Sequence, residues 1–366
     1  MKKCLSAIIL LTVVFASTGF STTLGTWQGA PADANHPGNL VGTGKWTDAY
    51  WKPTGKLPPP PSAQDQEIKI AKPKTVCTAD SNIGNYNCRL SITGGTDMAT
   101  APKLEIAKGT NLGALEFRVG AGGAAATGGF GCVVQTGGTY NINGKLLIGR
   151  YGSSQTNPNE ATGFYTISGG TITYPPTSNA ILCLGVYGPS EGTLTIVGKG
   201  ANISVKHLYI GGDGNKQGGT GTLEFKVDAN GVSPIKVADD VSIDLGGQET
   251  TAKLTVSAIG AAPKADILLV DNLGSTPITG IFDTVNEKPA TEGAEVVLNA
   301  AGNNYFYKLT YKGGNGDNDI MLKFDHAAPG AAPAAAKPAT PAAPVKPAAP
   351  ATGATPAAPA PAAPAK

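Results

Sequence analysis

Arginine and histidine are scarce in this chain of 366 residues: the only arginines are Arg89, Arg118 and Arg150, and the three histidines lie at positions 36, 207 and 326. Because the histidines are scattered along the sequence, we expect neither a metal centre nor a nucleophilic triad built on them. Five of the 28 basic residues are lysines of the two terminal segments, so the body between them is slightly acidic. A body without a basic surplus is not expected to bind nucleic acid or anionic lipid.

Long apolar runs are also missing. The longest begins at Leu5 and ends at Phe15, which is too short to cross a bilayer, and no later stretch approaches the roughly 18 apolar residues of a spanning helix. Lys2 and Lys3 precede this run and small residues follow it, which predicts a secretory signal at residues 1–21. We therefore expect an exported protein without a transmembrane segment, extracellular or on the cell surface, with the periplasm as the alternative.

Helical periodicity is absent as well, and the chain instead holds 50 glycines and 28 prolines. Glycine pairs recur along its middle. In three pairs the second glycine follows the first by eleven positions: Gly109–Gly120, Gly138–Gly149 and Gly200–Gly211. In two more pairs, Gly170–Gly185 and Gly231–Gly246, four residues are inserted into this spacing. The first members of the five pairs follow one another at intervals of 29 to 32 residues. A fixed period of this length is typical of a solenoid, in which each unit buries its apolar face only against its neighbours.

Short segments of alternating apolar and polar residues accompany the glycines, as expected of strands with one buried face. Before each second glycine the apolar positions include Phe117 and Val119, then Leu146 and Ile148, Leu182 and Leu184, Leu208 and Ile210, and Val241, Ile243 and Leu245. The pattern predicts an all-β, right-handed parallel β-helix with about 30 residues per coil. A β-sandwich is the alternative, but it explains the strands without explaining the recurrence.

The two ends of the solenoid require covers, because exposed strand edges pair with other chains. Residues 22–75 contain Trp27, Trp46 and Trp51 and a stiff LPPPPS stretch, and they are interpreted as an N-terminal cap. The alternative is that the three tryptophans contact the rings of a bound carbohydrate. The coils are expected at 76–264 and a C-terminal β-cap at 265–325. The Ala/Pro-rich segment 326–366 cannot form a core and is expected to be an extended, disordered tail.

Four cysteines follow the signal segment. Cys77 and Cys88 flank a turn-rich loop, and an exported protein folds in an oxidising compartment, so this pair is the candidate disulfide. Cys132 aligns with the inward position of Leu194 and is expected to be a small core residue, whereas Cys183 is expected to point outward. Side chains on opposite sides of the wall cannot form a bridge.

Several segments resemble the repeats and closing motif of autotransporter passenger domains and related bacterial β-strand-repeat surface proteins. These segments are GFYTISGGTITY, GGTGTLEF and YKLTYKGGNGDNDIMLKF. The closing motif matches at Tyr307, Tyr311, Gly313, Gly314, Gly316, Asn318, Asp319, Ile320 and Leu322. The resemblance implies secretion, a β-helix and a structural or adhesive role at a surface. The translocator barrel of that family does not follow in this sequence, so self-translocation is not implied.

The coils show little sign of chemistry. Asp239 and Asp240 are the only adjacent acidic pair, and they are interpreted as a solvated turn rather than as a catalytic pair. The segment GGNGDND at 313–319 is close to a calcium-binding nonapeptide, but it occurs once and is interpreted as the closing turn. We therefore predict no catalytic residue, metal or cofactor.

The sequence as a whole favours a secreted or cell-surface structural or adhesive β-helix without catalytic activity. Its expected partners are a cell-envelope polymer, a polysaccharide or a host or matrix surface, contacted through polar side chains on the outer wall. The alternatives are a polysaccharide-active β-helix enzyme, which is a lyase or a glycoside hydrolase, and a carbohydrate-binding module built on the three tryptophans. The oligomeric state is not predicted.

Overall fold

The computed structural model describes residues 22–27, 42–45, 51–52, 66–71, 73–79, 82–121, 129–150, 161–212, 219–244, 250–314 and 316–329. For residues 22–27, 42–45, 51–52, 66–67 and 82–88 the backbone alone is described. The predicted signal segment, Trp46 and residues 330–366 of the predicted tail lie outside this set. Within these ranges the chain contains strands and turns and no helix, so none of them contains a helix able to cross a membrane.

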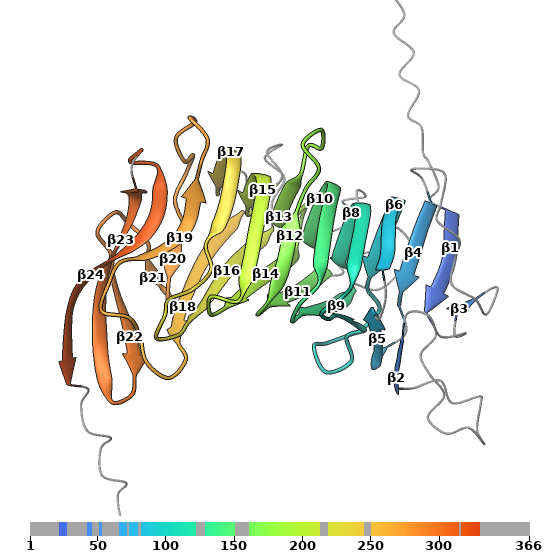
Figure 1. The fold of residues 1–366 in the computed structure, drawn as a ribbon, viewed down its shortest axis with the longest axis horizontal. Coiled ribbons are helices and arrows are strands. Elements are labelled where there is room, and N and C mark those ends of the chain that lie inside the picture. Colours follow the sequence, from blue (N-terminus) through green and yellow to red (C-terminus); the bar gives the residue numbers. More distant parts are fainter. Residues whose placement is uncertain are drawn as a thin grey trace, which may run out of the picture. The chain divides into compact units, whose positions relative to one another are not determined.

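The described strands form two sheets, which run side by side along the solenoid (Figure 1). The front sheet has 14 strands. They are β1 (Thr22–Trp27), β3 (Trp51–Lys52), β4 (Gln66–Ile70), β6 (Asn82–Ile92), β8 (Asn111–Ala121), β10 (Thr139–Arg150), β12 (Gly170–Thr173), β13 (Ile181–Val186), β15 (Ala201–Ile210), β17 (Ile235–Ile243), β19 (Ile267–Asn272), β22 (Glu295–Ala300), β23 (Asn303–Gly313) and β24 (Asp319–Pro329).

The back sheet has 10 strands, which alternate along the chain with those of the front sheet. They are β2 (Gly42–Lys45), β5 (Thr75–Ala79), β7 (Lys103–Ile106), β9 (Phe130–Gln135), β11 (Ala161–Ile167), β14 (Ser190–Val197), β16 (Thr220–Val227), β18 (Thr251–Ala258), β20 (Thr284–Val285) and β21 (Lys288–Pro289). Most coils thus contribute one strand to each sheet, and the coil of β11 contributes both β12 and β13 to the front sheet. Coils of about 29 residues stack in parallel through about 6 turns. The structure confirms the predicted all-β parallel solenoid.

The interior consists of ladders of apolar side chains that are continuous from coil to coil. One ladder in the front sheet contains Ile68, Leu90, Phe117, Leu146, Leu182, Leu208 and Val241, each at most 1% exposed. In the back sheet, Leu104, Val133, Tyr165, Leu194, Leu223 and Leu254 form a second ladder. Identical spacing in every coil places like side chains directly on top of one another, so each coil completes the core of the next.

Glycines close the corners between the two sheets. Gly149 of β10 has a φ of +67°, and a Cβ atom there would lie 2.1 Å from the carbonyl oxygen of Glu191 in β14. The equivalent residue in the last coil is Asp244 rather than Gly246, because Ile243 pairs with Ile210 in register. Asp244 adopts a φ of +42°, a conformation that aspartate tolerates better than most residues. Gly246 itself lies outside the described residues.

The structure corrects some of the inward positions. Extending the alternation to the fifth residue before the second glycine of a pair would place Leu115, Gly144 and Lys206 inward. The front strands have an irregular register near their middle, so the inward residues there are Ala114, Ile142 and Val205. Cys132 aligns with Phe164 and Lys103, so it occupies an outward position next to the inward Val133, although it is only 8% exposed. A shift of one residue exchanges the two faces of a strand, which explains the Cys132 error.

Parallel pairing also includes β1 with β4 and β2 with β5, so the segment interpreted as the N-terminal cap adds β1, β2 and β4 to the same two sheets. At the other end β22, β23 and β24 are antiparallel and extend the front sheet beyond β19. The Tyr311 hydroxyl donates to the carbonyl of Ala290 at 2.8 Å and accepts from the amide of Phe282 at 3.1 Å. The Tyr307 hydroxyl donates to the carbonyl of Pro263. These hydrogen bonds fasten the antiparallel segment to the last coils.

Truncation of a ladder residue tests the shared interior. We expect Leu208→Ala to lower the free energy of unfolding by about 2–5 kcal/mol, because it removes buried methyl groups and leaves a cavity between two coils. The matched control is Lys236→Ala on the adjacent strand, where the side chain is exposed and the expected change is within about 0.5 kcal/mol. Urea denaturation followed by circular dichroism measures both. Equal midpoints for the two variants would contradict the shared core.

Candidate functional site on the outer wall

The outer wall is defined here as the outward-facing side chains of β6, β8, β10, β13, β15 and β17. Parallel register arranges them in two rows. The first row contains Arg89, Glu116, Lys145, Ile181, His207 and Asp240, and the second contains Ser91, Arg118, Leu147, Cys183, Tyr209 and Ser242. The rows hold two clusters of charged side chains with an apolar cluster between them.

The arginine cluster consists of Arg89, Arg118, Arg150 and Glu116, and it contains every arginine of the chain. Arg118 donates to both carboxylate oxygens of Glu116 at 2.9 Å, and Arg89 donates to one of them at 3.0 Å. Arg150 Nε lies 3.7 Å from Glu116 Oε1, which is an ion-pair distance rather than a hydrogen bond. It is a buried atom without a hydrogen-bond partner among the described residues.

Burial and charge act in opposite directions on this cluster. Burial raises the pKa of Glu116, but the charges of the three arginines and the hydrogen bond from Arg118 outweigh it and lower the pKa below 4.5. For Arg150, burial and the nearby charge of Arg118 lower the pKa of the guanidinium. Its planar group also lies over the ring of Tyr187, with 5.5 Å between the guanidinium carbon and the ring centre. The cluster is therefore a half-buried, highly ordered group of charges.

The apolar cluster lies on the same wall, in the next coils. Leu147, Cys183 and Val186 are at most 3% exposed, and the partly buried Ile181, Tyr187 and Tyr209 pack against them. This cluster is separate from the interior core. It confirms that Cys183 points outward, and its low exposure comes from outer-wall neighbours rather than from the solenoid interior.

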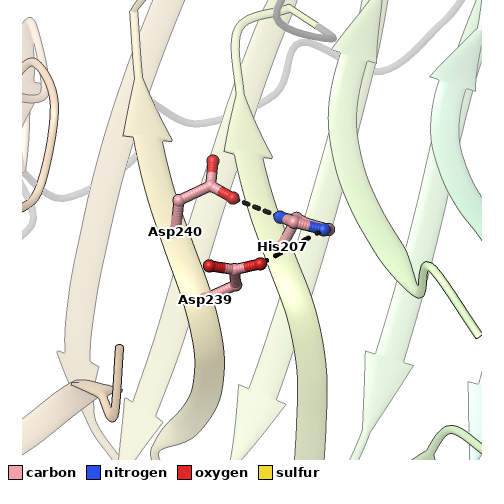
Figure 2. Close-up of side chains that lie close together, drawn as sticks. All are labelled: His207, Asp239 and Asp240. Atoms are coloured by element: carbon pink, nitrogen blue, oxygen red, sulfur yellow. Dashed lines mark hydrogen bonds and ion pairs between the residues drawn. The ribbon is translucent and has the colours of Figure 1, made fainter. Parts of the chain in front are cut away.

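The histidine cluster brings His207 of β15 next to Asp239 and Asp240 of β17 (Figure 2). Asp240 Oδ1 contacts His207 Nδ1, and Asp239 Oδ2 lies 3.9 Å from His207 Nε2. Asn179 Oδ1 is 2.7 Å from the same Nε2. One ligand atom from each of the three ionisable residues lies within 4.8 Å of the others, which is the geometry of a group able to hold a metal ion.

Tyr209 extends the histidine cluster along the wall. Burial, followed by the charge of Asp240 and a hydrogen bond to it, raises the pKa of Tyr209 to about 12. The phenol is therefore protonated at neutral pH and donates to the Asp240 carboxylate. Its ring centre lies 6.0 Å from that of His207. Asp240 is thus positioned by contacts with two aromatic side chains.

The sequence interpretation of Asp239 and Asp240 as a solvated turn does not hold, because both residues belong to β17 and face His207. The error has an identifiable cause. Taking Gly246 as the corner residue shifts the last coil by two positions and places Ser242 opposite His207, whereas the observed partner is Asp240. Recognising Asp244 as the corner residue is the signal in the sequence that reveals the pair.

The other predicted site residues remain separate from the outer wall. Trp27 and Trp51 are opposite one another on paired β1 and β3, but their side chains and all of Trp46 lie outside the described residues. The carbohydrate interpretation therefore stays a prediction. Cys77 is buried in the interior ladder next to Leu104, and the side chain of Cys88 is not described, so their disulfide also stays a prediction.

The segment at 313–319 forms one side of a cleft of about 470 Å³, and Leu268 and residues 271–274 form the other. Asn318 Nδ2 donates to the carbonyls of Asn272 and Gly274 at 3.0 and 2.9 Å, and Asp319 Oδ1 accepts from the amide of Asn272 at 2.8 Å. Both side chains therefore hold backbone groups, which favours the interpretation as a closing turn over a calcium site.

Comparison with known proteins gave no match. No protein-family model fits the chain, and no curated protein or solved structure is significantly similar to it.

The arginine cluster predicts a specific dependence of stability on pH. The pKa of Glu116 is lower in the folded than in the unfolded chain, so its stabilising effect is fully present above about pH 4.5. The effect disappears as the pH falls through the folded-state pKa. We expect Glu116→Gln to lower the free energy of unfolding by about 1–3 kcal/mol at pH 7, because it removes the carboxylate that the arginines share. The difference in free energy of unfolding between Glu116→Gln and the wild type becomes smaller below about pH 4.5.

Thermal unfolding between pH 3 and pH 7 measures this difference. Glu105→Gln is the matched control, because it removes the same charge from the more exposed Lys103–Glu105 pair of the back sheet. A difference between Glu116→Gln and wild type that stays constant across this range would show that Glu116 does not carry the effect.

Proposed function

We propose that this protein is an exported, cell-surface β-solenoid with a structural or adhesive role. We further propose that its outer wall binds an acidic polysaccharide of the cell envelope or of a matrix. The observation that carries the proposal is the convergence of Arg118 and Arg150 on a single carboxylate. The predicted secretory signal and the resemblance to passenger domains support location at a surface.

The solenoid supports such a role through its rigidity. Outward side chains of successive coils are held in register by the parallel strands, so chemical groups repeat at the spacing of neighbouring strands, which is about 4.8 Å. A long polymer can contact several coils at once, and many weak contacts then add up to useful affinity. Stacked repeats commonly serve as extended binding surfaces for the same reason.

The chemistry of the arginine cluster favours an acidic ligand. A guanidinium group matches the two oxygens of a carboxylate or sulfate in a planar, bidentate contact. Arg118 and Arg150 share the one negative charge of Glu116, and Arg150 Nε donates to none of the described residues. Lys145 follows Glu116 in the same row and adds a further positive charge. The ring of Tyr187 below Arg150 provides an apolar surface next to these charges.

A polysaccharide-active enzyme is the second candidate, and the observation that favours it is the histidine cluster. His207 contacts Asp240 through Nδ1, an arrangement that positions an imidazole for proton transfer. It occupies the same wall as the arginine cluster, so one polymer chain bound across the coils would contact both. The structural role stays our first proposal, because the predicted secretory signal, the resemblance to passenger domains and the arginine cluster all favour it, whereas the histidine cluster alone favours the enzyme.

Binding to purified polysaccharides tests the proposal. We expect the protein to bind polygalacturonate or alginate in sedimentation and calorimetry, and to bind neutral dextran at least tenfold more weakly. Arg118→Ala and Arg150→Ala each lower the affinity for the acidic polymer about tenfold, because each loses a bidentate contact. Affinity falls as salt is added, since screening weakens exposed charge pairs.

Lys226→Ala is the control for this experiment, because it removes one positive charge from the exposed Lys226–Glu224 pair of the back sheet. It is expected to bind like wild type. Equal binding of acidic and neutral polymers, or unchanged binding after both arginine substitutions, would overturn the acidic-ligand proposal. Release of shortened chains in the same incubations would instead establish the enzyme.

A further inference from the structure

We propose that the histidine cluster is a binding site for one divalent transition-metal ion of the Zn²⁺ type. His207 Nε2, Asp239 and Asn179 are the ligands, and Asp240 orients the imidazole through Nδ1. This inference goes beyond the proposed function and does not depend on it, because the arginine cluster and the histidine cluster occupy different coils and share no residue.

The His207 ring has an oxygen neighbour at each of its two nitrogens. Nδ1 faces the Asp240 carboxylate, and Nε2 faces Asn179 Oδ1 at 2.7 Å with a carboxylate oxygen of Asp239 beyond it. A neutral imidazole has one N–H, so it can satisfy only one of two oxygen neighbours. Either the ring carries a second proton, or the Asn179 amide is turned so that its Nδ2 donates to Nε2, or a cation occupies the position between Nε2 and the oxygens.

The distances on the Nε2 side suit a cation. Asp239 Oδ2 is 3.9 Å from Nε2, too far for a hydrogen bond. A tetrahedral zinc ion with bonds of about 2.0–2.1 Å holds its ligand atoms about 3.3 Å apart, so this separation is about 0.6 Å longer than a zinc site requires. An ion between the two atoms therefore requires only small side-chain movements. Asn179 Oδ1 lies on the same side of the ring and supplies a third ligand.

The negative charges of Asp239 and Asp240 lie close together. Asp239 and Asp240 lie next to one another on β17, and among the described residues neither forms an ion pair with a lysine or an arginine. Their only ion-pair partner there is His207. Two neighbouring carboxylates without a permanent cation repel each other, and a divalent ion removes this repulsion.

The backbone brings the carboxylates of Asp239 and Asp240 to one face of the sheet. Successive side chains of a regular strand point to opposite faces, so adjacent aspartates would normally be separated by the sheet. The register between β15 and β17 shifts between the Val205–Val237 pair and the His207–Asp240 pair, which adds one residue to β17. A bulge of this kind redirects a side chain, and here it brings Asp239 close to His207 as well.

The pattern of contacts also identifies the class of metal. An imidazole that binds metal through one nitrogen typically donates its other N–H to a carboxylate, and Asp240 occupies that second position. Imidazole ligation suits zinc and the neighbouring transition metals, whereas calcium and magnesium prefer sites made wholly of oxygens. Asp239 is 51% exposed at its side chain, so water can complete the coordination.

Isothermal titration calorimetry and equilibrium dialysis of the full chain, free of any histidine tag, test the site with ZnCl₂, CaCl₂ and MgCl₂. We expect one equivalent of Zn²⁺ to bind, reversed by EDTA, with Ca²⁺ and Mg²⁺ at least tenfold weaker. His207→Gln abolishes binding at this site. The surface variant Asp239→Asn lowers the affinity more than tenfold, and Asp240→Asn lowers it about 10–100-fold through the orientation of His207.

His326→Gln is the matched control. His326 Nδ1 lies 3.1 Å from Asp325 Oδ2, so this pair reproduces one histidine–carboxylate contact without the second carboxylate. We expect its removal to leave Zn²⁺ binding unchanged. Nuclear magnetic resonance of the imidazole nitrogens gives an independent readout: Zn²⁺ shifts the Nε2 signal of His207, while Nδ1 keeps its proton.

Three results would overturn the metal site: no saturable Zn²⁺ binding by wild type, equal binding by wild type, His207→Gln and Asp239→Asn, or a His207 ring that keeps both N–H protons when Zn²⁺ is present in excess. The last result would assign His207 to a salt bridge with Asp240 instead. Because no polysaccharide enters the experiment, its failure leaves the proposed polymer binding untouched.

Discussion

In-register stacking of parallel strands is the constraint on which the rest of this structure depends. A coil of about 29 residues is too small to enclose a core of its own. Each coil therefore buries its inward side chains against equivalent residues above and below. Leu146, Leu182 and Leu208 follow one another in a single ladder and are fully buried. A shift of the register by one residue would move this apolar set to the solvent face.

The same register determines the outer wall. Once the inward residues are aligned, the outward ones must align too, so residues about 30 positions apart in sequence become neighbours. Glu116 receives guanidinium groups from two neighbouring strands in this way, and His207 receives the carboxylates of the next. The two clusters differ in their electrostatics: arginines surround a carboxylate in the first, whereas carboxylates surround an imidazole in the second.

The outer wall thus combines a cationic group, an apolar group and an anionic group along one sheet. This order suits a ligand that is itself extended and repetitive, because separate groups of the ligand meet separate clusters. A rigid scaffold also keeps the side chains of each cluster in place without a ligand, which reduces the entropy lost on binding. These properties support a surface role in which the solenoid presents chemistry along its length.

The sequence by itself determined the fold class, the coil length and most of the interior. Glycine spacing and alternation identified the ladders, since both are set by local strand and turn geometry. The tertiary structure alone decided the irregular middle of the front strands, the outward position of Cys132 and the substitution of Asp244 for a corner glycine. It also decided which charged residues meet. A bulge or a single replaced glycine shifts the pairing by one or two residues, and local pattern cannot detect such a shift because every shifted register still alternates. The arginine and histidine clusters depend on that exact pairing, so only the folded chain brought them together.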